Sequence, residues 1–151
     1  MTDLTSALDD LVNTTLPSSE WKLIDQKRID LFATATEDMQ WIHVDVTRAK
    51  REMPNGMTIA HGFLSLSLAA GIKPAGFELP GVAKSLNYGF NKIRFLDVIS
   101  SGSRVRIHAQ LKEWKPRHNN FLLIWEITVE QENSDTPAVV AEALQLLEPE
   151  E

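Results

Sequence analysis

Residues 59–72 place the strongest constraint on how this chain can fold. At helical spacing their apolar side chains, Leu64 and Leu66 among them, point in several directions. A helix that is apolar nearly all round is a buried one. Gly71 and Pro74 are typical of a helix end. The chain therefore needs a sheet that covers one central helix.

Alternating apolar and polar residues predict strands after residues 80–81. The segments 105–111 and 121–130 both alternate in this way, as half-solvated strands do. Residues 117–120 lie between them and favour a hairpin connection. Shorter strands are expected near 85–90 and 93–95, with a bulge at Gly89, and a last strand near 138–146. Together these segments predict an antiparallel sheet.

Helices are expected in the first third of the chain. Leu4, Leu8 and Leu11 stand at helical spacing, so residues 1–20 form a short helix or a loosely docked arm. A helix capped by Asp25 is predicted over about 27–36, and a short polar one over 47–52, ended by a turn at 54–56. Helices first and strands second indicate one α+β domain over residues 1–151, with a curved antiparallel sheet around one long helix.

Composition excludes several classes of function. The chain has 151 residues, 43% of them hydrophobic and 24% charged, and its net charge is -6. That charge argues against generic binding to nucleic acid or acidic lipid. The absence of cysteine excludes a disulfide scaffold, a thiol nucleophile and a thiolate metal site. The acidic first residues do not resemble a secretory signal, and no apolar run approaches the ~18 residues of a membrane span. We expect a soluble cytoplasmic protein.

A carboxylate and an imidazole stand five residues apart, at Asp38 and His43, in an expected loop. An Asp and a His that share a water form an acid/base pair, because imidazole accepts a proton near neutral pH. Alternatively, Asp38 caps the next turn and His43 is a satisfied interior histidine. A metal site that also uses Asp45 and His61 is disfavoured, since no second carboxylate–histidine pair follows at ligand spacing.

His61 and Gly62 lie at the entry to the predicted buried helix. The first backbone N–H groups of a helix lack internal partners, and the helix dipole there favours negative charge. A glycine at this place lets a substrate carbonyl approach the backbone closely, as in an oxyanion hole. The alternative is that Gly62 allows tight packing of the helix against the sheet. The sequence leaves both interpretations open.

At these residues the chain resembles the MaoC-like dehydratases, the family of (R)-specific enoyl-CoA hydratases, and in particular its NodN-like members. The family pattern is Asp, any residue, Asn-Pro, an aliphatic residue and His, followed some twenty residues later by aliphatic-x-His-Gly. Asp38, Ile42 and His43 match the first part, and the segment 59–63 matches the second. The segment 88–95 also resembles NodN-type members. The resemblance covers roughly residues 20–147.

Two residues depart from the family pattern. Gln40 replaces the usual Asn and keeps an amide that can form hydrogen bonds. Trp41 replaces the usual Pro, which removes a rigid turn and adds bulk to the loop. With His61 and Arg94, these two residues are the expected substrate contacts. Arg48, Lys50, Arg51, Lys92 and Arg94 are candidate contacts for CoA phosphates, although a run of charge is usually a solvated face.

The resemblance implies a hot-dog fold, a homodimer and a reaction of fatty acid metabolism. Asp38 and His43 would activate water for addition to a trans-2-enoyl thioester, giving an (R)-3-hydroxyacyl thioester. The Gly62 N–H would stabilise the thioester oxygen. The reaction uses no metal or redox cofactor, and CoA or acyl carrier protein carries the substrate. The competing functions are a hot-dog thioesterase and a non-catalytic acyl-thioester-binding subunit; retention of both Asp38 and His43 argues against the latter.

Overall fold

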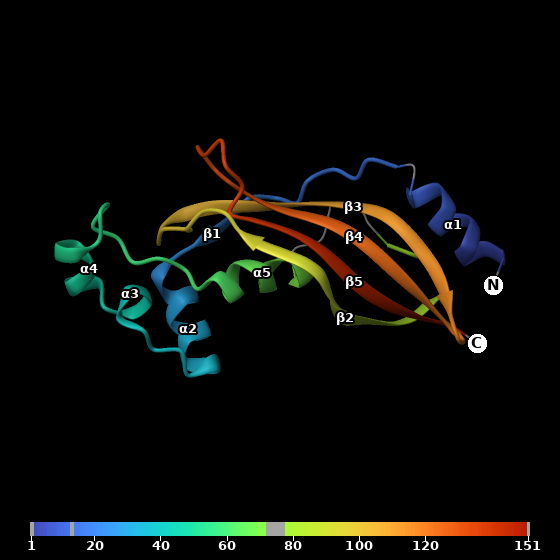
Figure 1. Ribbon diagram of the computed structural model, residues 1–151, viewed down its shortest axis with the longest axis horizontal. Helices are drawn as coiled ribbons and strands as arrows, with labels where there is room; N and C mark the ends of the chain where they lie inside the picture. Colours follow the sequence, from blue (N-terminus) through green and yellow to red (C-terminus); the bar gives the residue numbers. More distant parts are fainter. Residues whose placement is uncertain (1, 13, 72–77, 151) are drawn as a thin grey trace.

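One antiparallel sheet forms the centre of the computed structural model, which describes residues 2–12, 14–71 and 78–150 (Figure 1). Its five strands lie in the order β1-β3-β4-β5-β2, and all their pairings are antiparallel. The strands are β1 (Lys22–Ile24), β2 (Val82–Phe95), β3 (Ser103–Arg117), β4 (Asn120–Gln131) and β5 (Val139–Pro149). The short β1 and the long β2 are therefore the two edges of the sheet.

The helices gather around this sheet at different places. They are α1 (Thr2–Val12), α2 (Gln26–Thr36), α3 (Trp41–Val44), α4 (Val46–Glu52) and α5 (Gly62–Gly71). Figure 1 shows α5 beneath the curled sheet, α2 to α4 together at one end of the molecule, and α1 at the other end. No helix in the described ranges has both the length and the apolar character of a membrane span.

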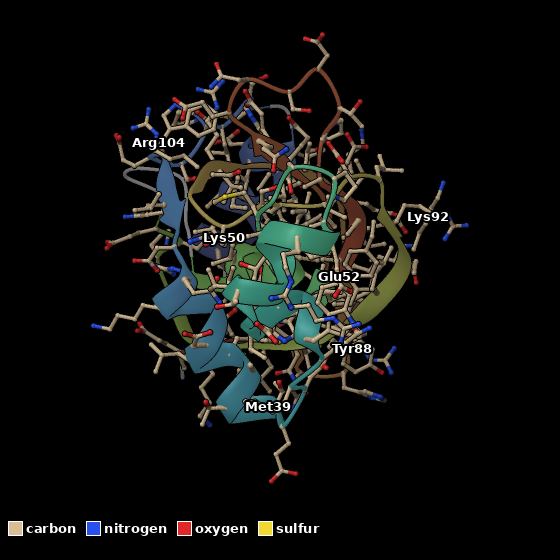
Figure 2. The ribbon with its side chains drawn as sticks, turned by 90° about the vertical axis from the view of Figure 1, so that its left-hand side faces the viewer. Met39, Lys50, Glu52, Tyr88, Lys92 and Arg104 are labelled. Carbon is tan, nitrogen blue, oxygen red and sulfur yellow. The ribbon has the colours of Figure 1, made fainter. Side chains whose placement is uncertain are left out.

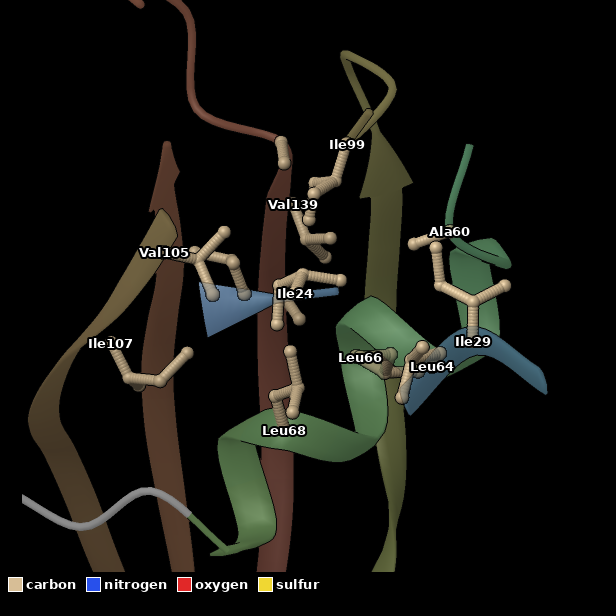
Figure 3. Close-up of a cluster of buried hydrophobic side chains, with 13 residues drawn as sticks. Ile24, Ile29, Ala60, Leu64, Leu66, Leu68, Ile99, Val105, Ile107 and Val139 are labelled. Atoms are coloured by element: carbon tan, nitrogen blue, oxygen red, sulfur yellow. The ribbon is translucent and has the colours of Figure 1, made fainter. Parts of the chain in front are cut away.

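The helix α5 packs on the sheet through a cluster of aliphatic side chains (Figure 3). Leu64, Leu66 and Leu68 are buried there, together with Val105 and Val139 from the strands. Burial of each such side chain contributes roughly 1.5–3 kcal/mol. The sequence prediction of a curved antiparallel sheet around a central helix is confirmed.

A second apolar cluster joins α1 to the same sheet. Leu4, Leu8 and Leu11 are buried against residues that include Leu123 and Trp125 of β4. Alternate β4 residues contribute to both clusters, which therefore share one face of that strand. Of the two structures expected for the N-terminal segment, a helix is the one that forms.

Two predicted strands are one strand in the structure. The segments 85–90 and 93–95 both belong to β2, which pairs with β5 through register shifts at Asn87/Gly89 and Phe90/Lys92. The shift at Phe90/Lys92 interrupts the alternation of side chains in the gap between the two predicted segments, which is why the sequence pattern broke there. The bulge expected at Gly89 is confirmed. So is the hairpin, because β3 ends at Arg117 and β4 begins at Asn120.

The central helix is less enclosed than its sequence predicts. It begins at Gly62, and Ile59 instead forms a β-bridge with Ser100. Phe63 is 68% exposed, so the expectation of burial on all sides is wrong within one chain. The reason is that the sheet covers one side of the helix. The expected helix residue Ile72 and the stop signal at Pro74 lie outside the described residues.

Candidate active site

The Asp38–His43 segment connects α2 to α4. Glu37 ends α2 in the left-handed conformation, with φ 61°, and the chain then reaches Asp38. The expected loop contains a short helix, α3, whose last turn carries His43. Figure 2 views the molecule from the end that carries α2 to α4. The loop prediction is therefore only partly right, because Asp38 lies in the loop and His43 lies within the single helical turn of α3.

His43 is held in the interior by contacts from two other segments of the chain, at Gln26 and at residues 58–59. The residue is 6% exposed, and its Nδ1–H donates to the backbone carbonyl of Ile59 at 2.7 Å. The side-chain amide of Gln26 donates to the backbone carbonyl of His43 at 2.7 Å, and the Thr58 hydroxyl donates to the same Gln26 side chain. With Nδ1 carrying the proton, Nε2 keeps a lone pair that can accept one.

Asp38 lies beside His43 without touching it. A carboxylate oxygen of Asp38 and a ring nitrogen of His43 lie within 4.8 Å of each other. Within the described chain no hydrogen bond joins the two side chains. Two hydrogen bonds of about 2.8 Å each span such a gap through one water molecule. The Asp38 side chain is 56% exposed, so solvent and substrate can reach it.

Burial lowers the pKa of His43 from its ordinary value of 6.5. The bond to the Ile59 carbonyl opposes that shift, the neighbouring His61 adds to it, and the Asp38 charge opposes it. The net effect is an imidazole that is neutral at pH 7. A neutral imidazole is the form that can take a proton from water.

The imidazole of His61 lies in the interior, behind the pair. The residue is 2% exposed, and its Nε2–H donates to the backbone carbonyl of Asp38 at 2.9 Å. Its ring stacks on that of His43, with centroids 3.7 Å apart and planes at 23°. The sequence predicts a substrate contact here. The structure instead places the ring against Asp38 and His43.

Asp38, His43 and His61 together form a possible metal-ligand set. Nδ1 of His43 and Nε2 of His61 each donate to a backbone carbonyl, so one nitrogen of each ring remains as a possible ligand. The fourth residue considered from the sequence, Asp45, accepts the Arg48 backbone N–H as the N-cap of α4. Asp45 therefore has a structural role at the start of α4.

Gly62 is the first residue of α5, and in the described chain its N–H has no hydrogen-bond acceptor. A Cβ at position 62 would lie 3.2 Å from ring carbons of Phe95. Phe95 in turn meets Phe63 edge-on, with ring centroids 5.9 Å apart. Both interpretations of this glycine therefore have support: the helix packs closely on Phe95, and the exposed Gly62 has an N–H without an acceptor in the described chain.

The other predicted substrate contacts lie around this centre. Gln40 is exposed, and its backbone carbonyl accepts the His43 N–H at 3.0 Å. The Arg48 guanidinium lies 4.0 Å over the half-buried ring of Trp41. Arg94 donates to the backbone carbonyl of Ile93 next to it on β2.

The candidate phosphate contacts fall into two groups. Arg48, Lys50 and Arg51 belong to α4, while Lys92 and Arg94 belong to β2. Figure 2 shows Lys92 pointing outward from its strand, apart from Lys50. The structure therefore does not bring the five cations together in one place within a single chain.

Gln26 and Thr58 were not among the residues predicted from sequence. Gln26 donates to the main chain of His43, 17 residues further along the chain. Thr58, which is 32 residues from Gln26, donates to the Gln26 side chain and so completes the link. Neither residue has a spacing or a motif that marks this role. Only the fold brings them together.

A family model described as MaoC like domain matches residues 9–131. The chain therefore belongs to the MaoC-like domain family. Nodulation protein N of Rhizobium leguminosarum bv. viciae is 43% identical to it over 135 residues, 88% of this chain and 84% of that protein. The 3-hydroxyacyl-thioester dehydratase Z of Mycobacterium tuberculosis (strain ATCC 25618 / H37Rv) is 42% identical over 127 residues, 83% of each.

Solved structures show the same fold. The unliganded R-hydratase PhaJ1 from Pseudomonas aeruginosa aligns with a TM-score of 0.68 at 22% identity, covering 91% of this chain and 83% of that one. The (R)-hydratase from A. caviae aligns with a TM-score of 0.66, also at 22% identity, over 87% of this chain and 95% of that one. The sheet curled around α5 is thus the hot-dog fold, as predicted.

Proposed function

We propose that this protein hydrates trans-2-enoyl thioesters to (R)-3-hydroxyacyl thioesters and catalyses the reverse dehydration. One observation carries the proposal: an Asp38 carboxylate oxygen and a His43 ring nitrogen lie within 4.8 Å of each other, a separation that one shared water can bridge. The relative named a 3-hydroxyacyl-thioester dehydratase supports this class of reaction. The same Asp38 carboxylate also lies 4.0 Å from Nε2 of His61, so both buried histidines of the described chain are close to this one acid.

Water addition follows from the roles of the two side chains. His43 takes a proton from the bridging water, and the water oxygen bonds to C3 of the enoyl group. The C2–C3 π electrons move to the thioester, whose oxygen gains negative charge. The pair then returns one proton to C2, so that the elements of one water molecule are added. Acid/base help of this kind is worth about 10²–10⁴-fold.

Two further groups stabilise charge in this scheme. The Asp38 carboxylate stabilises the imidazolium that forms when His43 takes the proton. The Gly62 N–H donates to the thioester oxygen as it becomes enolate-like. Losing one such donor costs about 10²–10³-fold in other enzymes. The chemistry is complete without a metal or redox cofactor.

The substrate carrier and the oligomer belong to the same proposal. CoA or acyl carrier protein carries the acyl chain, and the cations on α4 and β2 contact its phosphates. Because these cations lie on separate elements, a second subunit can unite them in one site. We propose a homodimer, since β2 is a long edge strand with Leu86, Tyr88 and Phe90 exposed along it.

The test follows purified protein with crotonyl-CoA and longer enoyl-CoA substrates. Loss of enoyl thioester absorbance without release of free thiol, and an (R) product, are expected. Release of free CoA without hydration would identify a thioesterase. Binding of the thioester with neither reaction would identify a non-catalytic subunit. Either of these two outcomes contradicts the proposal.

A further inference from the structure

The proposed reaction assigns no role to His61, although this residue contacts both Asp38 and His43. Its side chain is 3% exposed, so a substrate cannot reach most of it. Its Nε2–H bonds to the Asp38 carbonyl at 2.9 Å, and its ring stacks on His43 at 3.7 Å. The buried His61 imidazole therefore contacts both Asp38 and His43.

A further contact of the His61 ring is with an aromatic side chain. Phe32 contacts it, with ring centroids 5.0 Å apart, and Nδ1 is buried with no hydrogen-bond partner among the described residues. Burying a polar atom without a partner is unfavourable. An apolar ring such as phenylalanine would fill this place without that penalty. The arrangement therefore points to a role for the Nε2–H itself.

The residue held by that Nε2–H lies in a short segment outside the helices and strands. Residues 38–40 are neither helix nor strand, and the Asp38 side chain is 56% exposed. The bond from His61 ties this segment to the first residues of the α5 region, 23 positions along the chain. A main-chain anchor of this kind fixes the position of the Asp38 backbone, and it brings one carboxylate oxygen to 4.0 Å from the same Nε2.

We infer that His61 is a positioning residue: its Nε2–H anchors Asp38 through the main-chain carbonyl, and its ring sets the plane of His43. The inference rests on the proposed function and deepens the same site. It replaces the sequence-based expectation of a substrate contact at this position.

Two substitutions separate the hydrogen bond from the ring. His61→Phe keeps a flat ring and loses the donor, while His61→Gln keeps an amide N–H that can reach the Asp38 carbonyl. We expect His61→Phe to lower kcat with enoyl-CoA by about 10- to 10²-fold with KM nearly unchanged, because small displacements of a reacting group cost up to about 10²-fold. His61→Gln should recover a clear part of that loss.

Phe32→Leu is the matched control, since it changes the packing against the same ring and leaves the donor in place. Its kcat should stay near that of the wild type. An activity-independent readout is amide hydrogen exchange, which should quicken over residues 38–43 in His61→Phe, less in His61→Gln, and not in β3 or β4.

The outcomes separate this inference from the proposed function. A wild type without hydratase activity refutes the proposed function, while the exchange measurement still tests the anchor. Wild-type kcat and exchange in His61→Phe would overturn the inference. So would equal losses of kcat, exchange protection and Tm in both His61 variants, because the role would then be structural only.

Discussion

At the scale of single residues, the site depends on where each imidazole holds its proton. His43 donates from Nδ1 to Ile59, and His61 donates from Nε2 to Asp38, so each ring is oriented by a backbone carbonyl. Backbone carbonyls only accept, which fixes both tautomers in the neutral state. His43 is left with its Nε2 lone pair for the proposed water.

The lowered pKa of His43 predicts a specific dependence on pH. In the unfolded chain the pKa of this histidine is near its ordinary value of 6.5. In the folded protein its pKa is lower, because burial disfavours the charged ring. Between those two values the unfolded state binds more protons, so folding stability is complete above 6.5 and declines as pH falls through this window. His43→Gln should lack this component.

Thermal melts of wild type and His43→Gln at pH 7.5 and 5.5 measure the difference directly. The fall in Tm between the two conditions should be larger for the wild type. The acidic limb of the wild-type kcat/KM profile should also lie below pH 6.5, because the base must be neutral. Equal falls in Tm for both proteins, or a limb above pH 6.5, would count against His43 as the base.

At the scale of elements, α5 joins the core to the candidate site. Its leucines pack on the sheet, while its first residue, Gly62, faces the Phe95 ring and carries the proposed oxyanion donor. The N-terminus of α5 thus has two possible roles at Gly62, close packing on Phe95 and donation of a hydrogen bond to the substrate. A substitution at this glycine tests which of the two the position requires.

We predict that Gly62→Ala lowers kcat by about 10-fold or more while Tm stays close to wild type. The new methyl group shields the N–H, whose complete loss would cost about 10²–10³-fold. Phe95 is 47% exposed, so its ring can move the few tenths of an ångström that the methyl group needs. Steady-state kinetics and a thermal melt measure both effects.

The matched variant is Gly62→Ala combined with Phe95→Leu, which relieves the crowding and keeps the methyl group. Its kcat should stay low if shielding of the N–H is the cause. A Gly62→Ala protein with wild-type kcat and an unchanged melt would assign the glycine to packing alone.

The elements differ in how far the sequence predicts them. Strands β3 and β4 alternate strongly because one face of each is buried, so their existence could be predicted. Two bulges concealed the continuity of β2, and the single turn of α3 depends on contacts distant in the chain, such as the bond from Gln26 to His43. The motif marks Asp38 and His43 as candidates from their spacing alone. The His61–Asp38 bond could not be predicted, because its partners lie 23 residues apart and only the fold brings them together.

At the scale of the whole molecule, the two edges of the sheet are unequal. The β1 edge is three residues long, whereas the β2 edge is 14 residues long and exposes large apolar side chains. A long exposed edge is a template for pairing with another chain. This asymmetry, with the exposed Phe63, supports β2 as the side on which a second subunit packs.

Light scattering at micromolar concentration should therefore give a mass about twice the 17.0 kDa of one chain. Phe90→Lys, which puts a charge on the long edge, should shift the mass toward the monomer. Leu23→Lys is the matched control, because Leu23 is 49% exposed on the opposite edge. A monomeric wild type, or equal effects of the two lysines, would contradict a dimer through β2.

The most direct test of the account is crotonyl-CoA hydration by Asp38→Asn, His43→Gln and the double variant, with a thermal melt of each. Both side chains act on one water, so each single change should lower kcat by about 10²–10⁴-fold. The double change should cost little more than the worse single one, because groups that act as a unit are strongly non-additive. Tm should barely change for Asp38→Asn, since that side chain is 56% exposed. Near-normal turnover in Asp38→Asn with an intact melt would contradict the central claim.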